Sequence, residues 1–284
     1  MLQCNTARVV VGMASPMFDC MTEMQQALLR QPPGHSGVPD GLPATIDGWA
    51  VFLDVDGTIV DIAETPDAVV VEEQLPSQLA LLSDRLGGAL AVVTGRELAF
   101  LDTLLSGLTF SAAGLHGAEM RLPDGSWHKT EPSPLLAIAR SKLEAAAAAW
   151  PGIVVEDKGA SIAAHFRLAP QFEGQVEAIM SVIAAELGSS HVIQRGKSVV
   201  EIRPRGHDKG NAVTAFMAMP PFLGRRPLAI GDDLTDEAMF AVANDLGGLS
   251  VKVGPPGIAT LATARLDDPA AVRSWIASVV EPKA

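Results

Sequence analysis

The amino-acid sequence predicts an α/β fold, in which a doubly wound, Rossmann-like parallel sheet carries an inserted α+β domain. Two observations predict the sheet: short apolar runs alternate with stretches of helical spacing, and polar residues stand where several of these runs end. A third observation predicts the insertion, because the alternation breaks off after residue 122 and resumes at residue 205.

The first core strand is expected at Trp49, where an unbroken apolar run leads into Asp54. Such a run, bounded by a turn signal, is typical of a strand buried on both faces of a parallel sheet. The segment 114–119 is expected as a glycine-bracketed loop that presents His116 and Glu119. The other expected core elements are helices at 75–86, 98–105, 209–217, 235–242 and 269–280, strands at 89–93, 109–114, 249–253 and 264–266, and a strand ending at residue 232.

Between the two core segments, the spacing predicts an αββαββ unit. Its helices are expected at 135–150 and 172–187, and its strands at 153–156, 161–167, 191–194 and 198–202. We therefore expect a core domain of residues 47–122 and 205–284, with residues 123–204 inserted on two linkers as a cap domain. Residues 1–46 have no sustained periodicity, and we expect a flexible N-terminal extension there.

Composition limits the partners. Hydrophobic residues make up 48% of the 284 residues, which suits a buried core, and no apolar run has the length of a membrane span. The formal charge of −12 disfavours nucleic acid and anionic membrane surfaces as partners. Cys4 and Cys20 suggest neither a disulfide framework nor a metal site. Nothing in the sequence predicts an oligomeric state.

Four short motifs carry groups that could do chemistry. Asp54 and Asp56 precede Gly57, Thr94-Gly95-Arg96 follows the second strand, Lys209 opens a helix, and Asp232, Asp233 and Asp236 follow a later strand. Each motif has an ordinary interpretation. Asp54 and Asp56 could lie in an acidic surface turn, and Thr94 could cap a helix. Lys209 could be a surface lysine, and the three later aspartates could be charges at a helix N-terminus. Together, their order and spacing resemble the signature motifs of the haloacid dehalogenase superfamily of phosphatases.

This resemblance implies a role for each motif residue. Asp54 would be the nucleophile that forms an aspartyl-phosphate, and Asp56 the acid and base that serves the leaving oxygen and the attacking water. Thr94, Gly95, Arg96 and Lys209 would hold the phosphoryl group. A Mg²⁺ cofactor would bind to Asp54, the carbonyl of Asp56 and Asp232, while Asp233 and Asp236 would orient metal-bound waters and Lys209.

Further strings extend the resemblance to the trehalose-6-phosphate phosphatase family. They are residues 114–119, 155–167 and 196–204. The second string includes His165-Phe166-Arg167, where that family often has His-Tyr-Arg. The resemblance implies a cap in which Glu156, Lys158 and Glu201 bind the distal sugar, with His116, Glu119 and Arg203 as further candidates. His165 is expected chiefly as a packed, hydrogen-bonded residue.

By this resemblance the chain would hydrolyse trehalose 6-phosphate in the cytoplasm, as the last step of trehalose biosynthesis and in functional link with a synthase. Two alternatives keep the fold: a phosphatase for another sugar phosphate, such as a sucrose or mannosylglycerate phosphate, and a non-catalytic relative. A trehalose-cleaving glycoside hydrolase using Glu156 and Glu201 is a third, but it would leave the core motifs without a purpose.

Overall fold

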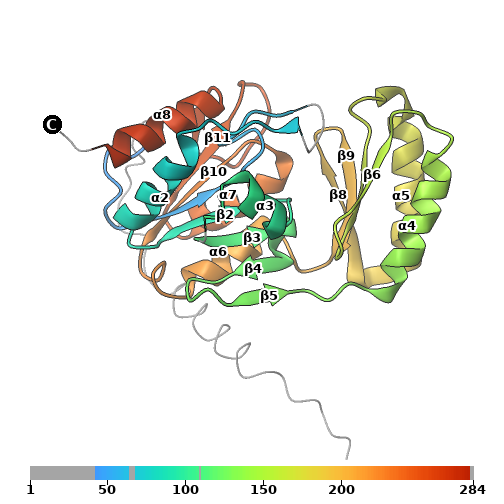
Figure 1. Ribbon diagram of the computed structural model, residues 1–284, viewed down its shortest axis with the longest axis horizontal. Coiled ribbons are helices and arrows are strands. Elements are labelled where there is room, and N and C mark those ends of the chain that lie inside the picture. Colours follow the sequence, from blue (N-terminus) through green and yellow to red (C-terminus); the bar gives the residue numbers. More distant parts are fainter. Residues whose placement is uncertain (1–41, 64–67, 109, 282–284) are drawn as a thin grey trace, which may run out of the picture. The chain divides into compact units, whose positions relative to one another are not determined.

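In the computed structural model, which describes residues 42–63, 68–108 and 110–281, the first predicted strand lies inside a large sheet (Figure 1). The sheet order is β12-β11-β10-β1-β2-β3-β4-β5. Its strands are β1 (Trp49–Leu53), β2 (Leu90–Val93), β3 (Ser111–Gly114), β4 (Glu119–Arg121), β5 (Trp127–Lys129), β10 (Arg226–Gly231), β11 (Leu249–Val253) and β12 (Ala264–Leu266). The strands from β12 to β3 are parallel, which confirms the predicted sheet, and β4 and β5 are antiparallel.

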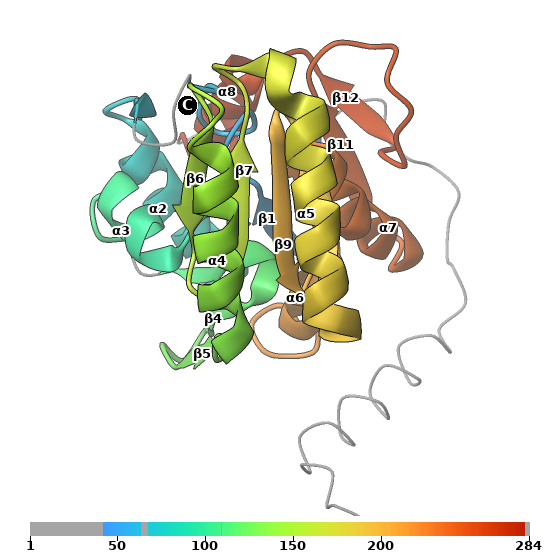
Figure 2. The ribbon, with the colours of Figure 1, turned by 90° about the vertical axis from the view of Figure 1, so that its right-hand side faces the viewer.

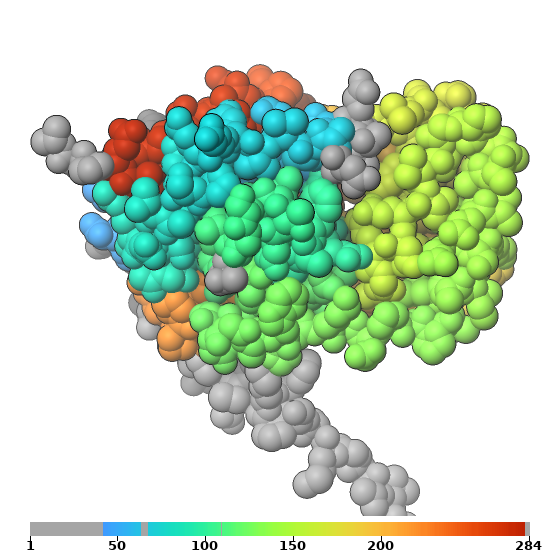
Figure 3. Space-filling model, viewed as in Figure 1, coloured from blue at the N-terminus to red at the C-terminus, as the bar shows by residue number. Residues whose placement is uncertain are grey.

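Helices cover both faces of this core sheet. They are α2 (Leu75–Arg85), α3 (Leu98–Leu104), α6 (Lys209–Met217), α7 (Glu237–Asp245) and α8 (Pro269–Val280). Helices α2 and α3 lie on one face and α7 on the other (Figure 2), while α2 packs against α8 and α6 against α7. In the space-filling view, the segments of α2 and α3 form much of the visible face of the core (Figure 3). The order of strands and the two helix layers make the sheet doubly wound.

The centre of the sheet is fixed by packing against α6. All residues of β1 are buried, and the ring of Phe52 lies 6.3 Å from that of Phe216 and 5.5 Å from that of Phe222. On either side, β1 pairs with β10 and β2. Because β1 is held by two neighbouring strands and an aromatic layer, the residues that follow it start from a rigid position.

The β4–β5 hairpin was not predicted. Each strand has only three residues, and charged side chains break any apolar run, so the strand signal is weak. The hairpin closes through Leu122 N to Ser126 O at 2.9 Å, and Asp124 Oδ1 accepts from Ser126 N at 2.9 Å. β5 pairs with β4 in the core sheet, so the core sheet extends past residue 123, where the cap was expected to begin. The division of the chain at residues 123 and 204 stays a prediction.

The inserted unit has the predicted αββαββ order. It contains α4 (Pro134–Ala147), β6 (Val154–Asp157), β7 (Ile162–His165), α5 (Glu173–Leu187), β8 (His191–Gly196) and β9 (Val199–Pro204). Its antiparallel sheet has the order β6-β7-β9-β8, and α4 and α5 lie side by side on one face (Figures 1 and 2). The apolar sides of these helices bury their own cluster, which includes Leu143, Met180 and Ile183. The cap therefore has a core of its own.

One predicted segment has no structural outcome. Residues 1–41 of the predicted extension, with Cys4 and Cys20, lie outside the described residues. No helix in the described ranges has both the length and the apolar composition needed to cross a membrane.

Candidate active site

The carboxyl end of β1 brings two carboxylates to one pocket. Asp54 N still donates to Ile230 O at 3.0 Å, so Asp54 continues the pairing of β1 with β10. Gly57 then adopts a left-handed conformation with φ of 78°, and Gly57 N donates to Val60 O at 2.8 Å. Because the chain reverses there, Asp56 stays at the same edge of the sheet, and both aspartates line the pocket.

Lys209 reaches the same point from the first turn of α6. Asp208 caps that helix by accepting from Asn211 N at 2.8 Å, and the buried Lys209 Nζ lies 2.6 Å from both Asp54 Oδ1 and Asp236 Oδ1. Burial alone would lower the pKa of Lys209, but the two carboxylates outweigh it and raise the pKa above its usual value. Lys209 is therefore a fixed positive charge beside Asp54, not a surface lysine.

Asp236 is fully buried and already bonded through both oxygens. Its Oδ1 accepts from Lys209, and its Oδ2 accepts from Asp232 N at 2.8 Å and Asp233 N at 2.9 Å. Asp233 in turn caps the short helix 234–236. A Cβ on Gly231 would lie 2.2 Å from Asp236 Cγ, so only glycine admits this carboxylate behind β10. Asp236 thus holds Lys209 and the loop that carries Asp232.

The residues present fit a divalent cation with oxygen ligands. Oxygens of Asp54, Asp232 and Asp236 lie within 4.8 Å of one another, and Lys209 pairs with two of these three carboxylates. Burial and the neighbouring Asp236 raise the pKa of Asp54 well above its usual value, and burial with Asp236 raises that of Asp232 to about 7. Crowded carboxylates with one lysine among them leave negative charge uncompensated, which a hard cation would neutralise.

The second motif, Thr94-Gly95-Arg96, forms another wall of the same pocket. Thr94 is buried, its N donates to Ala113 O at 2.8 Å, and its Oγ1 accepts from Arg96 N at 3.2 Å. Arg96 forks onto Asp56 with two contacts of 2.6 Å, and its guanidinium lies 4.4 Å from the Phe100 ring centre. A bidentate pair of this kind orients the carboxylate of Asp56.

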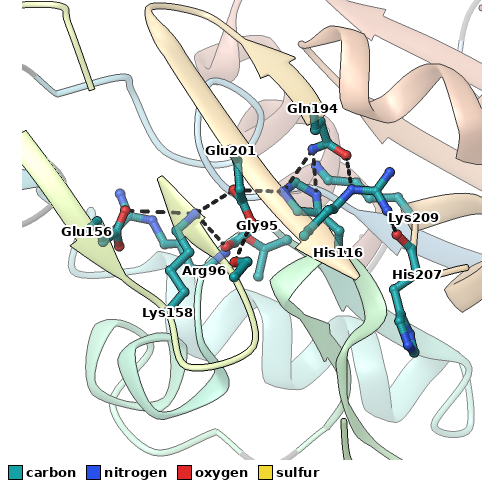
Figure 4. A network of polar contacts seen from close by, with 12 residues as sticks. Gly95, Arg96, His116, Glu156, Lys158, Gln194, Glu201, His207 and Lys209 are labelled. Carbon is teal, nitrogen blue, oxygen red and sulfur yellow. Dashed lines mark hydrogen bonds and ion pairs between the residues drawn. The ribbon is translucent and has the colours of Figure 1, made fainter. Parts of the chain in front are cut away.

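The cap contributes a second charged group to the pocket. Lys158 Nζ lies 2.9 Å from Glu201 Oε2, 3.2 Å from Gly95 O and 3.8 Å from Glu156 Oε2 (Figure 4). Burial would raise the pKa of Glu201, but Lys158, His116 and Ser161 together outweigh it and lower that pKa. Glu156 also contacts His165 Nε2 at 2.7 Å. The contact of Lys158 with Gly95 joins the cap to the second motif.

His116 stands between core and cap. It takes a left-handed conformation with φ of 57°, and its N donates to Thr94 O at 2.9 Å. Arg203 donates to Gln194 Oε1, so the amide nitrogen of Gln194 faces the His116 ring, 3.0 Å from Nε2 (Figure 4). Burial lowers the pKa of His116, and a neutral ring nitrogen can accept from Gln194. The ring is a hydrogen-bonding surface on the pocket wall.

Residues 52–269 match the model of the trehalose-phosphatase family. The chain belongs to this family. It is 51% identical over 238 residues to a probable trehalose-phosphate phosphatase of Sinorhizobium fredii, covering 84% of this chain and 90% of the relative. It is 42% identical over 229 residues to the trehalose-6-phosphate phosphatase of Escherichia coli, covering 80% and 85%.

A solved structure has the same fold. It is the C-terminal domain of a C. albicans trehalose-6-phosphate phosphatase, with a TM-score of 0.73 and 22% identity, over 82% of this chain and 92% of that one. This likeness confirms the predicted core with an inserted cap. Membership of the trehalose-phosphatase family makes the chain a phosphoric monoester hydrolase.

Two residues predicted as sugar contacts do not line the pocket. Glu119 lies on β4 and not in a loop, is buried, and accepts from Leu98 N at 3.0 Å and Lys129 Nζ at 2.6 Å, so it supports the start of α3. Arg203 bonds Gln194 and the His207 carbonyl. The other predicted pocket residues lie on its walls, namely Asp54, Asp56, Thr94, Gly95, Arg96, His116, Glu156, Lys158, Glu201, Lys209, Asp232 and Asp233.

The prediction missed Gln194 and Ser161. Gln194 stands directly opposite Glu201 in the β8–β9 ladder, and so on the same face of the cap sheet. Ser161 Oγ lies 2.6 Å from Glu201 Oε1. The hairpin around 196–198 sets this register, so pairing the two predicted strands would have identified Gln194 once Glu201 was chosen.

Proposed function

We propose that this chain is a Mg²⁺-dependent phosphatase that hydrolyses trehalose 6-phosphate to trehalose and phosphate. One observation carries the proposal: a single pocket joins the buried Asp54–Lys209 pair of the core to the Lys158–Glu201 pair of the cap. The first pair suits a phosphoryl group and the second suits sugar hydroxyls. The names of the relatives supply the trehalose part.

In the proposed reaction, a carboxylate oxygen of Asp54 attacks phosphorus and the bond to the sugar oxygen breaks. Asp56 gives a proton to that leaving oxygen, which departs as the alcohol of trehalose. Asp56 then takes a proton from water, whose oxygen attacks the aspartyl-phosphate and releases phosphate from Asp54. Lys209, Thr94 and the loop at Gly95 and Arg96 hold the phosphoryl oxygens, because a transferring phosphoryl group needs donors and positive charge.

Mg²⁺ would be held by Asp54, Asp232 and the carbonyl of Asp56, where it would neutralise charge on the phosphoryl oxygens. Asp236 takes no ligand position in this proposal, because Lys209 and two backbone amides occupy its oxygens. It keeps Lys209 charged, and Asp233 orders the same loop. These are the supporting roles expected for both residues.

In the cap, Glu156, Lys158 and Glu201 would bind hydroxyls of the distal glucose, with His116 and Gln194 beside them. Carboxylates accept from hydroxyls and an ammonium donates to them, so a buried set of this kind rejects a ligand that leaves it unpaired. Glu119 and Arg203 receive no sugar contact in this proposal, because their polar atoms are bonded elsewhere. The cytoplasmic location and the link to a synthase stay predictions.

The test is phosphate release from trehalose 6-phosphate, beside sucrose 6-phosphate and glucose 6-phosphate, with Mg²⁺ present and then chelated. We expect Mg²⁺-dependent turnover, with a preference for trehalose 6-phosphate of about 10²-fold or more. Similar rates on all three esters would contradict the cap assignment and keep the phosphatase. No turnover of any ester would support the non-catalytic alternative.

A further inference from the structure

The two linkers between core and cap contact each other directly. The first linker, 130–133, runs from β5 to α4, and the second, 205–208, runs from β9 to α6. Thr130 Oγ1 of the first lies 3.2 Å from His207 Nε2 of the second, across 77 residues of sequence. Both side chains are half-buried. The cap is therefore joined to the core by two linkers that are hydrogen-bonded to each other.

The hydrogen bonds of His207 assign its ring nitrogens. His207 Nδ1 lies 3.3 Å from the carbonyl oxygen of Gly117, which can only accept, so Nδ1 carries the proton. In the neutral ring Nε2 then accepts from the Thr130 hydroxyl. Thr130 N also donates to Ala118 O at 2.7 Å. The His207 imidazole thus connects both linkers with Gly117, and the Thr130 backbone connects the first linker with Ala118, both directly after His116.

Arg203 extends this connection to the pocket wall. It lies near the end of β9, and its guanidinium donates to the carbonyl of His207 and to Gln194 Oε1. Gln194 in turn faces His116. A continuous series of contacts therefore runs from His207 of the second linker, through Arg203 and Gln194, to His116. Figure 4 labels His207, Gln194 and His116. Any movement of the second linker relative to the first must disturb this series.

We propose that Thr130 and His207 form a clasp between the two linkers, and that this clasp holds the cap where Gln194 and Lys158 meet the core. They are positioning residues, since neither lines the pocket. Without the clasp the linkers move independently, and a smaller fraction of molecules has both pocket walls in place. Only a substrate that contacts both domains then binds more weakly, in proportion to that fraction. The choice of such a substrate rests on the proposed function.

The first test compares Thr130→Val with Thr130→Ser. Valine keeps the shape of threonine and removes the hydroxyl, whereas serine keeps the hydroxyl. We expect Thr130→Val to lower kcat/KM for trehalose 6-phosphate by about fivefold, the effect of one neutral hydrogen bond, mostly through KM. p-Nitrophenyl phosphate, which is small enough to bind to the core alone, should be hydrolysed at the unchanged rate. Thr130→Ser should behave as the wild type with both substrates.

A double-mutant cycle adds an independent measure. If the two residues act only through their mutual bond, His207→Ala combined with Thr130→Val should cost no more than the larger single effect. Equal losses with both substrates would overturn the clasp, because they would show damage to the core. Unchanged kinetics in Thr130→Val, or strictly additive effects in the cycle, would overturn it as well.

Hydrogen exchange separates this inference from the proposed function. If the wild type hydrolyses p-nitrophenyl phosphate but not trehalose 6-phosphate, the proposed substrate is wrong, and the clasp is judged without any substrate. We expect amides of residues 130, 131, 133 and 205–208 to exchange about fivefold faster in Thr130→Val than in the wild type or Thr130→Ser. Equal exchange in all three proteins would overturn the clasp.

Discussion

Replacing Gly57 by alanine should weaken Mg²⁺ binding although none of the proposed ligands is substituted. An added Cβ would lie 2.2 Å from Asp232 Oδ2, so the carboxylate must move by roughly 1 Å to restore ordinary van der Waals contact. Asp232 is only partly buried and can turn towards solvent. The displacement should therefore cost little free energy in the metal-free protein. Its cost should appear when Mg²⁺ binds, because Asp232 must then return to its position as a ligand. We expect the Mg²⁺ dissociation constant to rise about 10–100-fold, as when the support of a metal ligand is removed.

Gly48→Ala is the matched control. Gly48 has φ of 74° and Gly57 has φ of 78°, so both alanines carry a similar left-handed penalty of about 1 kcal/mol. A Cβ on Gly48 meets nothing within 4 Å. Calorimetric titration with Mg²⁺, together with urea unfolding of the metal-free proteins, separates the two effects. If Gly57→Ala bound Mg²⁺ within about twofold of Gly48→Ala, the reasoning about Asp232 would be refuted.

Three further predictions follow from charges and caps. Because the pKa of Asp232 is raised to about 7, the metal-free protein loses stability as the pH rises towards and through 7. Below pH 7, Mg²⁺ must compete with a proton for the Asp232 carboxylate. The Mg²⁺ affinity should thus increase about tenfold from pH 6 to pH 8, with a larger Mg²⁺-induced rise in Tm at pH 8. Lys158→Met leaves Glu201 buried without its cation and should cost about 3–5 kcal/mol in urea unfolding, part of which Glu201→Gln should restore; no recovery would contradict a direct ion pair. Asp268→Ala removes the cap of α8 and should cost about 1 kcal/mol with unchanged KM, and an altered KM would contradict a purely structural role.

The grouping of the core side chains was predictable because it follows from strand ends. Asp54, Thr94 and Asp232 each follow a buried apolar strand, and parallel strands end at one edge of the sheet. That rule brings the three side chains together before any coordinates exist. Lys209 joined them because α6 begins beside the same edge. Local pattern and global topology agree at these positions, so the sequence signal was strong.

Contacts between domains were less predictable. Glu119 was expected in a loop beside His116, but the β4–β5 hairpin turns it towards Leu98 N. Arg203 was expected at the sugar, but the second linker lies within its reach and its guanidinium bonds the His207 carbonyl. Both outcomes depend on how separate elements pack, and residue spacing along one strand does not encode that. Gln194 was missed for the same reason, although strand register would have suggested it.

The position of the cap in the chain has a consequence for synthesis. Strand β1 pairs with β10, where Leu53 is opposite Ile230, so the strand that leads into Asp54 pairs on that side only with residues made much later. All cap strands lie within 154–204, and a growing chain can complete the cap sheet first. A nascent chain that stops before β10 would then carry a folded cap on a core with an open central edge. We therefore expect the inserted cap to fold before the core sheet is complete.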